Sequence, residues 1–228
     1  MTFINSLKET DGKIVLKKNE PPSPELIISN EKSILVCFLD TETTGVNKLN
    51  DQIIELAFKV VEFEESSGKI ISIKCEYESF NQPSKSIDNK ITTLTGINNE
   101  MVKNKEIDWS KVDSLLKDVD FIVAHNARFD RAFVDRHSSI SPKKIWACSI
   151  KDIDWFSKGF SNQKQELLCY WHGFYCDAHR AMNDVDALIQ LMIHSHYDKN
   201  RPILELIKNA KKIICKILVT NFPYDEQK

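Results

Sequence analysis

The sequence has no long hydrophobic run and no large excess of charge of one sign. No apolar stretch approaches the ~20 residues that a membrane-spanning helix needs. The opening residues, MTFINSLKETDGK, contain no apolar core followed by small residues, so we expect no secretory signal. The formal net charge is −2, which argues against a protein that coats nucleic acid electrostatically. These absences favour a cytoplasmic protein without a membrane partner.

Cysteine is present but shows no recognisable framework. The six cysteines are scattered, and no two of them form a C-x-x-C pair. This usage favours reduced, mostly buried thiols over a disulfide framework or a zinc site. Because 42% of the residues are hydrophobic, we expect a buried core rather than global disorder.

The composition divides the chain into three segments. Residues 1–32 carry charge runs and a proline cluster around Pro22, which predicts a weakly ordered lead-in. Residues 33–198 alternate apolar runs with helical patterns and are predicted to form one domain. Residues 199–228 contain a helical pattern and the strand-like run ICKILVT. This run either adds to the sheet or begins a further module, and we slightly favour the second interpretation.

Hydrophobic patterning predicts a mixed α/β domain. Strands are expected at 33–40, 52–64, 70–80, 120–126 and 145–148, the first three antiparallel. Helices are expected at 87–96, 109–117, 127–137, 149–158, 163–172, 180–196 and 202–212. Asn126 is a candidate N-cap for the helix at 127–137. This order indicates an α/β fold with a mixed five-stranded sheet flanked by helices.

Acidic residues stand at the predicted strand ends and helix starts. Asp40 and Glu42 end the first strand two positions apart, so both side chains project to the same face. Asp130 lies one turn into the helix after the strand at 120–126, and Asp184 follows His179 by five residues. Ligands collect at the carboxyl ends of strands in α/β sheets, so these acids are candidates for one site.

The spacing of His179 and Asp184 separates their positions. Five helical steps turn a side chain by ~140°, so the two cannot converge from within one helix. We therefore expect His179 on the entering loop and Asp184 inside the helix. This arrangement lets the histidine meet a water molecule beside a metal ion.

Each acid alone also has an ordinary interpretation. An Asp-x-Glu at a strand end is usually solvated, and Asp130 beside Arg131 fits a weak surface ion pair. Taken together, however, four carboxylates would repel one another and raise one another's pKa unless cations bind between them. Ligands that are all oxygen atoms favour Mg²⁺ or Mn²⁺ over zinc.

The motifs DTETTG, AHNARFD and H-x4-D, in this order, resemble the three motifs of the DEDDh superfamily of 3′–5′ exonucleases. That superfamily includes the proofreading epsilon subunit of bacterial DNA polymerase III. The spacers ITTLTGINNEMV and WACSIKDIDW are similar to those of its stand-alone epsilon-like group. The resemblance covers about residues 33–196, fills all five catalytic positions and implies a ribonuclease H-like fold.

The resemblance implies two metal ions, Mg²⁺ or Mn²⁺, and a role for each catalytic residue. Asp40, Glu42 and Asp184 would hold the metal nearer the nucleophile, with Asp40 bridging to the second metal. Asp130 would complete the acidic set, partly through water. His179 would deprotonate the attacking water.

The resemblance also implies residues that hold the 3′ end of the substrate. Thr41, Thr43 and Thr44 would seat the last nucleotide. Leu94 and Thr95 would pack on the terminal base. Asn126 and Phe129 would hold the scissile end.

The implied reaction is hydrolysis of the terminal phosphodiester of DNA, with release of nucleoside 5′-monophosphates. The substrate would be a single-stranded or frayed 3′ end. An RNA-trimming exoribonuclease is the alternative enzyme, because the same motifs occur in both. A binding module without turnover is the alternative from another class, although no catalytic acid is missing. A polymerase or another replication or repair protein is the implied partner.

Overall fold

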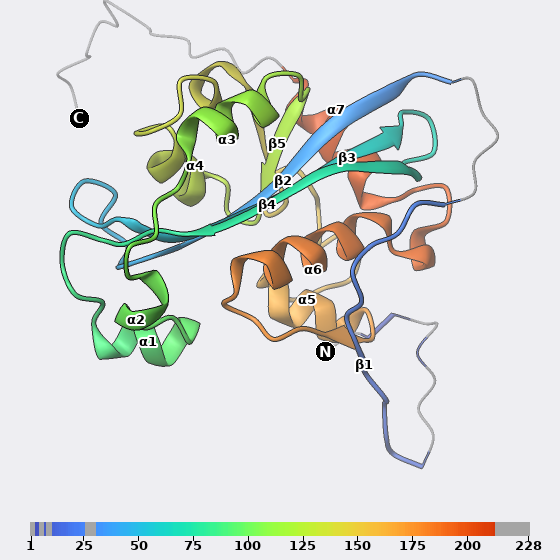
Figure 1. The fold of residues 1–228 in the computed structure, drawn as a ribbon. Helices are drawn as coiled ribbons and strands as arrows, with labels where there is room; N and C mark the ends of the chain where they lie inside the picture. Colours follow the sequence, from blue (N-terminus) through green and yellow to red (C-terminus); the bar gives the residue numbers. More distant parts are fainter. Residues whose placement is uncertain (1–2, 5–6, 8–10, 26–30, 213–228) are drawn as a thin grey trace, which may run out of the picture.

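A mixed five-stranded sheet forms the centre of the structure (Figure 1). The computed structural model describes residues 3–4, 7, 11–25 and 31–212. In chain order, the strands of the sheet are β2 (Ser33–Thr43), β3 (Ile53–Glu64), β4 (Ile70–Phe80), β5 (Phe121–Ala124) and β6 (Ile145–Cys148). Their spatial order is β4-β3-β2-β5-β6, so β2 occupies the middle of the sheet.

The strand directions confirm the predicted mixed sheet. β3 pairs antiparallel with both β2 and β4, whereas β5 pairs parallel with both β2 and β6. The long apolar run of β2 is explained by this central position, because a strand with neighbours on both edges and helices on both faces is buried. The β2–β3 register places Glu42 opposite Glu55.

Helices cover both faces of the sheet (Figure 1). They are α1 (Asn89–Thr95), α2 (Asn99–Val102), α3 (Trp109–Leu116), α4 (Arg128–Val134), α5 (Gln165–Trp171), α6 (Ala181–Ile193) and α7 (Pro202–Ala210). Asp88 caps α1 by accepting a hydrogen bond from the backbone N–H of Lys90. Gly96 ends α1 with a φ of 72°, a conformation that glycine adopts without steric cost.

Alternating residues of β2 divide the core into two layers. Phe38 belongs to a buried cluster that includes Leu188 of α6. Leu39 belongs to the cluster on the other face, which includes Leu116 of α3. Successive side chains of a strand point to opposite faces, so the position two residues after Phe38 lies on the α6 face. That position is Asp40.

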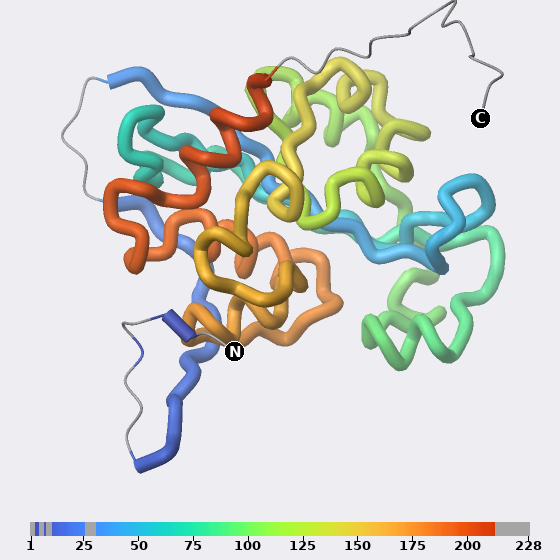
Figure 2. The backbone as a smooth tube through the Cα atoms, turned by 180° about the vertical axis from the view of Figure 1, so that it is seen from behind, coloured from blue at the N-terminus to red at the C-terminus, as the bar shows by residue number. Residues whose placement is uncertain are grey.

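The described parts of residues 1–32 contact the domain. Ile4 is buried in the cluster between the sheet and α6. The short strand β1 (Lys17–Lys18) pairs parallel with β7 (Phe174–Tyr175), and Glu25 forms an ion pair with Arg201. Figure 2 shows this N-terminal segment from the other side. The domain boundary at residue 33 stays a prediction.

The helix predicted at 149–158 is wrong, because these residues form a series of turns and bends. The side chains of Asp152 and Asp154 accept hydrogen bonds from the backbone N–H groups of Cys148 and Ser157. The indole of Trp155 donates a further bond to the backbone. Such side-chain bonds compete with helical hydrogen bonds and stabilise a compact loop.

The predicted N-cap at Asn126 is also wrong. The cap position of α4 is Ala127, which makes no side-chain bond, and Asn126 adopts a φ of 67°. The run ICKILVT lies outside the described residues, so its two interpretations stay open. No helix within the described ranges is long and apolar enough to cross a membrane. The cysteines of these ranges are free thiols, as predicted.

Candidate active site

Three carboxylates converge at the carboxyl end of the central strand. Asp40 and Glu42 lie on the same face of β2, and Asp184 lies in the first turn of α6, which packs on that face. One oxygen from each side chain lies within 4.8 Å of the others, and all three residues are half-buried. The predicted convergence of these acids is therefore confirmed.

Asp130 reaches the same cleft from the opposite layer. It lies in the first turn of α4 and is 2% exposed. Its Oδ1 accepts hydrogen bonds from the backbone N–H of Thr41, at 3.1 Å, and from the Thr41 hydroxyl, at 2.9 Å. Thr41 stands between Asp40 and Glu42, so this contact fixes α4 against the strand that carries two of the acids.

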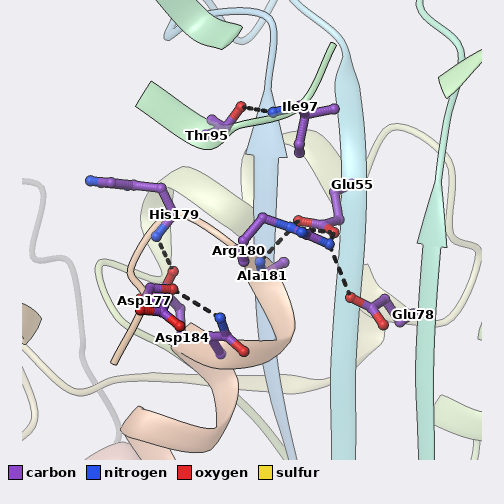
Figure 3. A network of polar contacts seen from close by, with 10 residues as sticks. Glu55, Glu78, Thr95, Ile97, Asp177, His179, Arg180, Ala181 and Asp184 are labelled. Carbon is purple, nitrogen blue, oxygen red and sulfur yellow. Dashed lines mark hydrogen bonds and ion pairs between the residues drawn. The ribbon is translucent and has the colours of Figure 1, made fainter. Parts of the chain in front are cut away.

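His179 and Asp184 take the arrangement that their spacing predicts. His179 lies on the loop before α6 with a φ of 63°, whereas Asp184 lies inside the helix. The backbone N–H of His179 donates to Asp184 Oδ2 at 2.8 Å. The imidazole is exposed and directed away from Asp184, as Figure 3 shows. The side chain is therefore accessible to solvent at the rim of the cleft.

The electrostatics of the acids indicate a site for cations. Burial is the main cause that raises the pKa of Glu42 to about 8, of Asp130 to about 7 and of Asp184 to about 6. The pKa of Asp40 is raised well above its usual range by burial and then by the charges of its acidic neighbours. A divalent cation would relieve this repulsion. Because the donors are all carboxylate oxygens, the residues present fit a hard cation such as Mg²⁺ or Mn²⁺.

All five predicted catalytic residues line one cleft of about 770 Å³. Of the predicted substrate residues, Thr41, Asn126 and Phe129 line it as well.

The other predicted substrate residues lie outside the lining of this cleft. The Thr43 and Thr44 hydroxyls bond within the loop that follows β2, to Gly45 and Asp51. Thr95 is buried and bonds within its own turn, whereas Leu94 is exposed on α1. In Figures 1 and 2, α1 and α2 stand apart from α5 and α6. The roles of these four residues stay predictions.

The sequence analysis missed residues that position the site. The side chain of Gln165 donates to the backbone oxygen of Asp184 at 2.9 Å and to Asp184 Oδ1 at 3.3 Å. Glu55, which is fully buried, accepts hydrogen bonds from Arg180 and from the backbone N–H of Ala181 (Figure 3). The available signal for Glu55 was an acidic residue inside the run IIELAFKVV, whose only other charged residue is Lys59. Nothing in the sequence marks Gln165.

The mixed sheet and the carboxylate cluster define a class of protein, the ribonuclease H-like, divalent-metal-dependent nucleases. The RNase_T family model, described as exonuclease, matches residues 37–192. The chain belongs to this exonuclease family, and the predicted resemblance is confirmed.

Curated relatives share part of this domain. The chain is 32% identical to the PolC-type DNA polymerase III of Thermotoga maritima over 119 residues, which are 51% of this chain and 8% of that protein. It is 36% identical to the 3′–5′ exonuclease DinG of Bacillus subtilis over 117 residues, 50% of this chain and 12% of that protein. The matches therefore span about a tenth of the length of these relatives.

Solved structures share the fold. Exonuclease X in complex with 5′-overhanging duplex DNA matches with a TM-score of 0.54 and 20% identity, covering 77% of this chain and 99% of that chain. A 3′-exonuclease that recognises the 3′ end of the histone mRNA stem-loop matches with a TM-score of 0.57 and 16% identity, covering 78% and 68%. At these identities the likeness shows the fold alone.

Proposed function

We propose that this chain is a metal-dependent 3′–5′ exonuclease that hydrolyses the terminal phosphodiester of DNA and releases nucleoside 5′-monophosphates. The observation that carries the proposal is the convergence of Asp40, Glu42 and Asp184 within one cleft that also contains Asp130 and His179. The 3′–5′ polarity is supported by the name of the DinG relative and by the motif order.

Two overlapping sets of carboxylates would hold the two metal ions. Asp40, Glu42 and Asp184 would hold one ion, and Asp40 and Asp130 would contribute to holding the second. When bound, such ions would supply a lowered pKa of water and stabilisation of the attacking and leaving oxygens in an in-line phosphoryl displacement. Asp130 also keeps its two hydrogen bonds from Thr41, which orient its carboxylate toward the strand.

His179 acts as the general base. Its exposed imidazole stands on the rim of the cleft, where a ring nitrogen can take the proton of the attacking water and pass it to solvent. Histidine is the side chain that most often accepts a proton as a general base, because one nitrogen of its neutral ring is a free acceptor. The bond from its own backbone N–H to Asp184 ties the base to a metal ligand.

The 3′ end of the substrate would lie along the cleft. Thr41, Asn126 and Phe129 line it. Thr41 would seat the last nucleotide, and Asn126 and Phe129 would hold the scissile end. Thr43 at the end of β2 and Thr44 directly after it would complete this seat. Leu94 and Thr95, at the end of α1, would pack on the terminal base.

DNA is the proposed substrate because the relatives by sequence include the PolC-type DNA polymerase III. RNA trimming is the second candidate, and the structural likeness to an exonuclease that recognises a histone mRNA end favours it. The polymerase relative also supports a replication or repair protein as partner. The proposed location is cytoplasmic.

The test compares 5′-labelled single-stranded DNA and RNA of one sequence in Mg²⁺ or Mn²⁺. We expect a ladder that shortens from the 3′ end, is abolished by EDTA and by Asp184→Ala, and is faster on DNA. Asp118→Ala is the matched control, because Asp118 is exposed and lies outside the cleft lining. A ladder that persists in Asp184→Ala would overturn the proposal, and a faster RNA ladder would reassign the substrate.

A further inference from the structure

The segment between β6 and α5 forms one wall of the catalytic cleft. Its lining residues are Ile150, Phe156, Ser161, Asn162, Gln163 and Lys164. None of these six residues is acidic, whereas the predicted catalytic carboxylates lie on β2, α4 and α6. A further carboxylate of the lining, Glu166, follows this segment in the first turn of α5 and accepts a hydrogen bond from the Tyr170 hydroxyl. This wall therefore differs in chemistry from the metal-binding part of the cleft, and it offers one cation, Lys164, together with uncharged groups.

The segment between β6 and α5 contains three aromatic residues, which lie in two different environments. Trp155 and Phe160 are buried, and their rings pack edge to face at 6.0 Å between centroids. Phe156, between them in the sequence, is 59% exposed and lines the cleft. No other aromatic side chain in the described ranges is as exposed. Packing in the core therefore explains why Trp155 and Phe160 are aromatic, but it does not explain the aromatic ring of Phe156.

The backbone that carries Phe156 is held on both sides. The carboxylate of Asp154 accepts hydrogen bonds from the Ser157 backbone N–H, at 2.9 Å, and from the Ser157 hydroxyl, at 2.5 Å. Glu205 of α7 accepts a bond from the Asp154 backbone and forms an ion pair with Lys158 at 2.6 Å. A ring presented from a fixed turn loses little conformational freedom when a flat ligand stacks on it.

We propose that Phe156 is a stacking platform for a nucleobase upstream of the terminal nucleotide, and that Lys164 binds a phosphate of the same single strand. The inference rests on the proposed exonuclease function. Aromatic side chains bind bases of any sequence because every base has a π face, and a nearby cation follows the backbone. Lys164 is exposed, and no carboxylate among the described residues forms an ion pair with it.

The upstream position follows from where the reacting bond must lie. The scissile phosphate has to reach Asp40, Glu42 and Asp184, which lie on β2 and α6. Phe156 belongs to a different segment of the wall. A strand that enters along this wall would pass Phe156 before its end reaches the carboxylates.

The first test separates a single-nucleotide substrate from an oligonucleotide. The p-nitrophenyl ester of thymidine 5′-monophosphate contains the reacting bond but no upstream base. We expect Phe156→Ala to raise KM for single-stranded oligonucleotides by about fivefold or more and to leave kcat/KM on the ester unchanged. Phe156→Trp, which keeps an aromatic ring, should have the KM of the wild type. Tyr175→Ala, which removes an exposed aromatic side chain outside the cleft lining, is the matched control.

The second test locates the contact. The fluorescent base 2-aminopurine, placed at successive positions of an oligonucleotide bound to Asp184→Asn, is quenched where it stacks. We expect quenching at an upstream position that is lost in Phe156→Ala and kept in Phe156→Trp. Lys164→Ala should weaken binding and reduce the salt dependence of the affinity by about one ion.

The outcomes distinguish the two proposals. Wild-type protein that cleaves neither substrate would count against the exonuclease function itself. Active wild-type protein with an unchanged KM in Phe156→Ala would overturn the stacking platform alone. An equal loss on the ester and on the oligonucleotide would also overturn it, because the ring would then act on the terminal nucleotide.

Discussion

Glu55 and Arg180 form an ion pair that joins the middle of the sheet to the loop that carries His179. Arg180 Nη2 lies 3.0 Å from Glu55 Oε1, and the Glu55 side chain is fully buried. Glu55 Oε2 also accepts a hydrogen bond from the backbone N–H of Ala181, the first residue of α6, at 3.0 Å. One buried carboxylate on β3 thus fixes the start of the helix that supplies Asp184.

Replacing Glu55 tests this connection. Glu55→Ala would remove the acceptor of the Ala181 N–H and the nearer of the two carboxylate partners of Arg180. We expect the free energy of unfolding to fall by about 3 kcal/mol and kcat to fall on the order of 10-fold to 100-fold, because the ligand and the base would lose their relative position. Denaturant unfolding and steady-state kinetics measure the two effects.

Two further variants show whether the role is positional. Glu55→Gln keeps an oxygen acceptor for the Ala181 N–H, so a smaller loss of kcat is expected than for Glu55→Ala. Glu78→Gln is the matched control. Glu78 is half-exposed, and its Oε1 lies farther from Arg180 Nη2, at 3.9 Å, than the Glu55 Oε1 does, at 3.0 Å. An unchanged kcat in a folded Glu55→Ala variant would contradict a positioning role.

The strands and the metal-binding acids could be predicted because they depend on local pattern. A period of two sets the face on which Asp40 and Glu42 lie, and the helical period separates His179 from Asp184. Both periodicities can be read from the residues that are neighbours in the sequence. The prediction held for these elements because the apolar runs around them are long and the sheet buries both faces of β2.

The loop at 149–158 and the supporting residues could not be predicted in this way. The apolar spacing of that segment resembles a helix, but the side chains of Asp152 and Asp154 bond to the backbone instead. Gln165 meets Asp184 only because α5 and α6 pack together in the fold. Contacts of this kind depend on tertiary packing, so a single sequence does not reveal them.

Gln165 is expected to support the metal site through Asp184. Its side-chain amide donates to Asp184 Oδ1 and to the backbone oxygen of the same residue. Removing such a partner of a metal ligand costs roughly 10-fold to 100-fold in metal affinity. We expect Gln165→Ala to weaken Mn²⁺ binding by about tenfold in a calorimetric titration.

Gln163→Ala provides the control for this variant. Gln163 lines the same cleft, but its amide donates to the backbone oxygen of Ile150 and not to a carboxylate. Its Mn²⁺ affinity should equal that of the wild type. Equal affinities in all three proteins would show that Gln165 does not support the ligand.

Removal of metal should make the stability of the protein fall as the pH rises. The folded-state pKa values of Glu42, Asp130 and Asp184, about 8, 7 and 6, lie above the values of an unfolded chain. Between about pH 4 and pH 8 the folded state therefore binds more protons than the unfolded state, and the free energy of unfolding decreases with pH. Bound cations should remove most of this dependence.

Thermal melts in EDTA and in saturating Mn²⁺ measure the effect. A ligand present at 100 times its dissociation constant stabilises the folded state by about 2.7 kcal/mol. We expect the increase in Tm on adding Mn²⁺ to be larger at pH 8 than at pH 5.5, because the carboxylates are then ionised without a competing proton. An increase that is the same at both pH values, or absent, would contradict a metal site formed by these acids.

His172 should produce the opposite dependence on pH, at a place away from the carboxylates. Burial lowers the pKa of its imidazole to about 3, and the ring bonds to the Leu168 carbonyl and the Tyr197 hydroxyl. An unfolded histidine is protonated below pH ~6.5, whereas the folded one stays neutral, so stability is lost as the pH falls below that value. At pH 5 the loss amounts to about 2 kcal/mol.

His172→Gln isolates this contribution. Glutamine does not titrate, so the difference in unfolding free energy between wild type and variant should shrink by about 2 kcal/mol between pH 7.5 and pH 5. Denaturant unfolding in saturating Mn²⁺ suppresses the carboxylate effect. His125 and His194, whose pKa values burial lowers to about 4, are present in both proteins, so the difference between wild type and variant reports His172. A constant difference across this range would mean that His172 binds a proton in the folded protein.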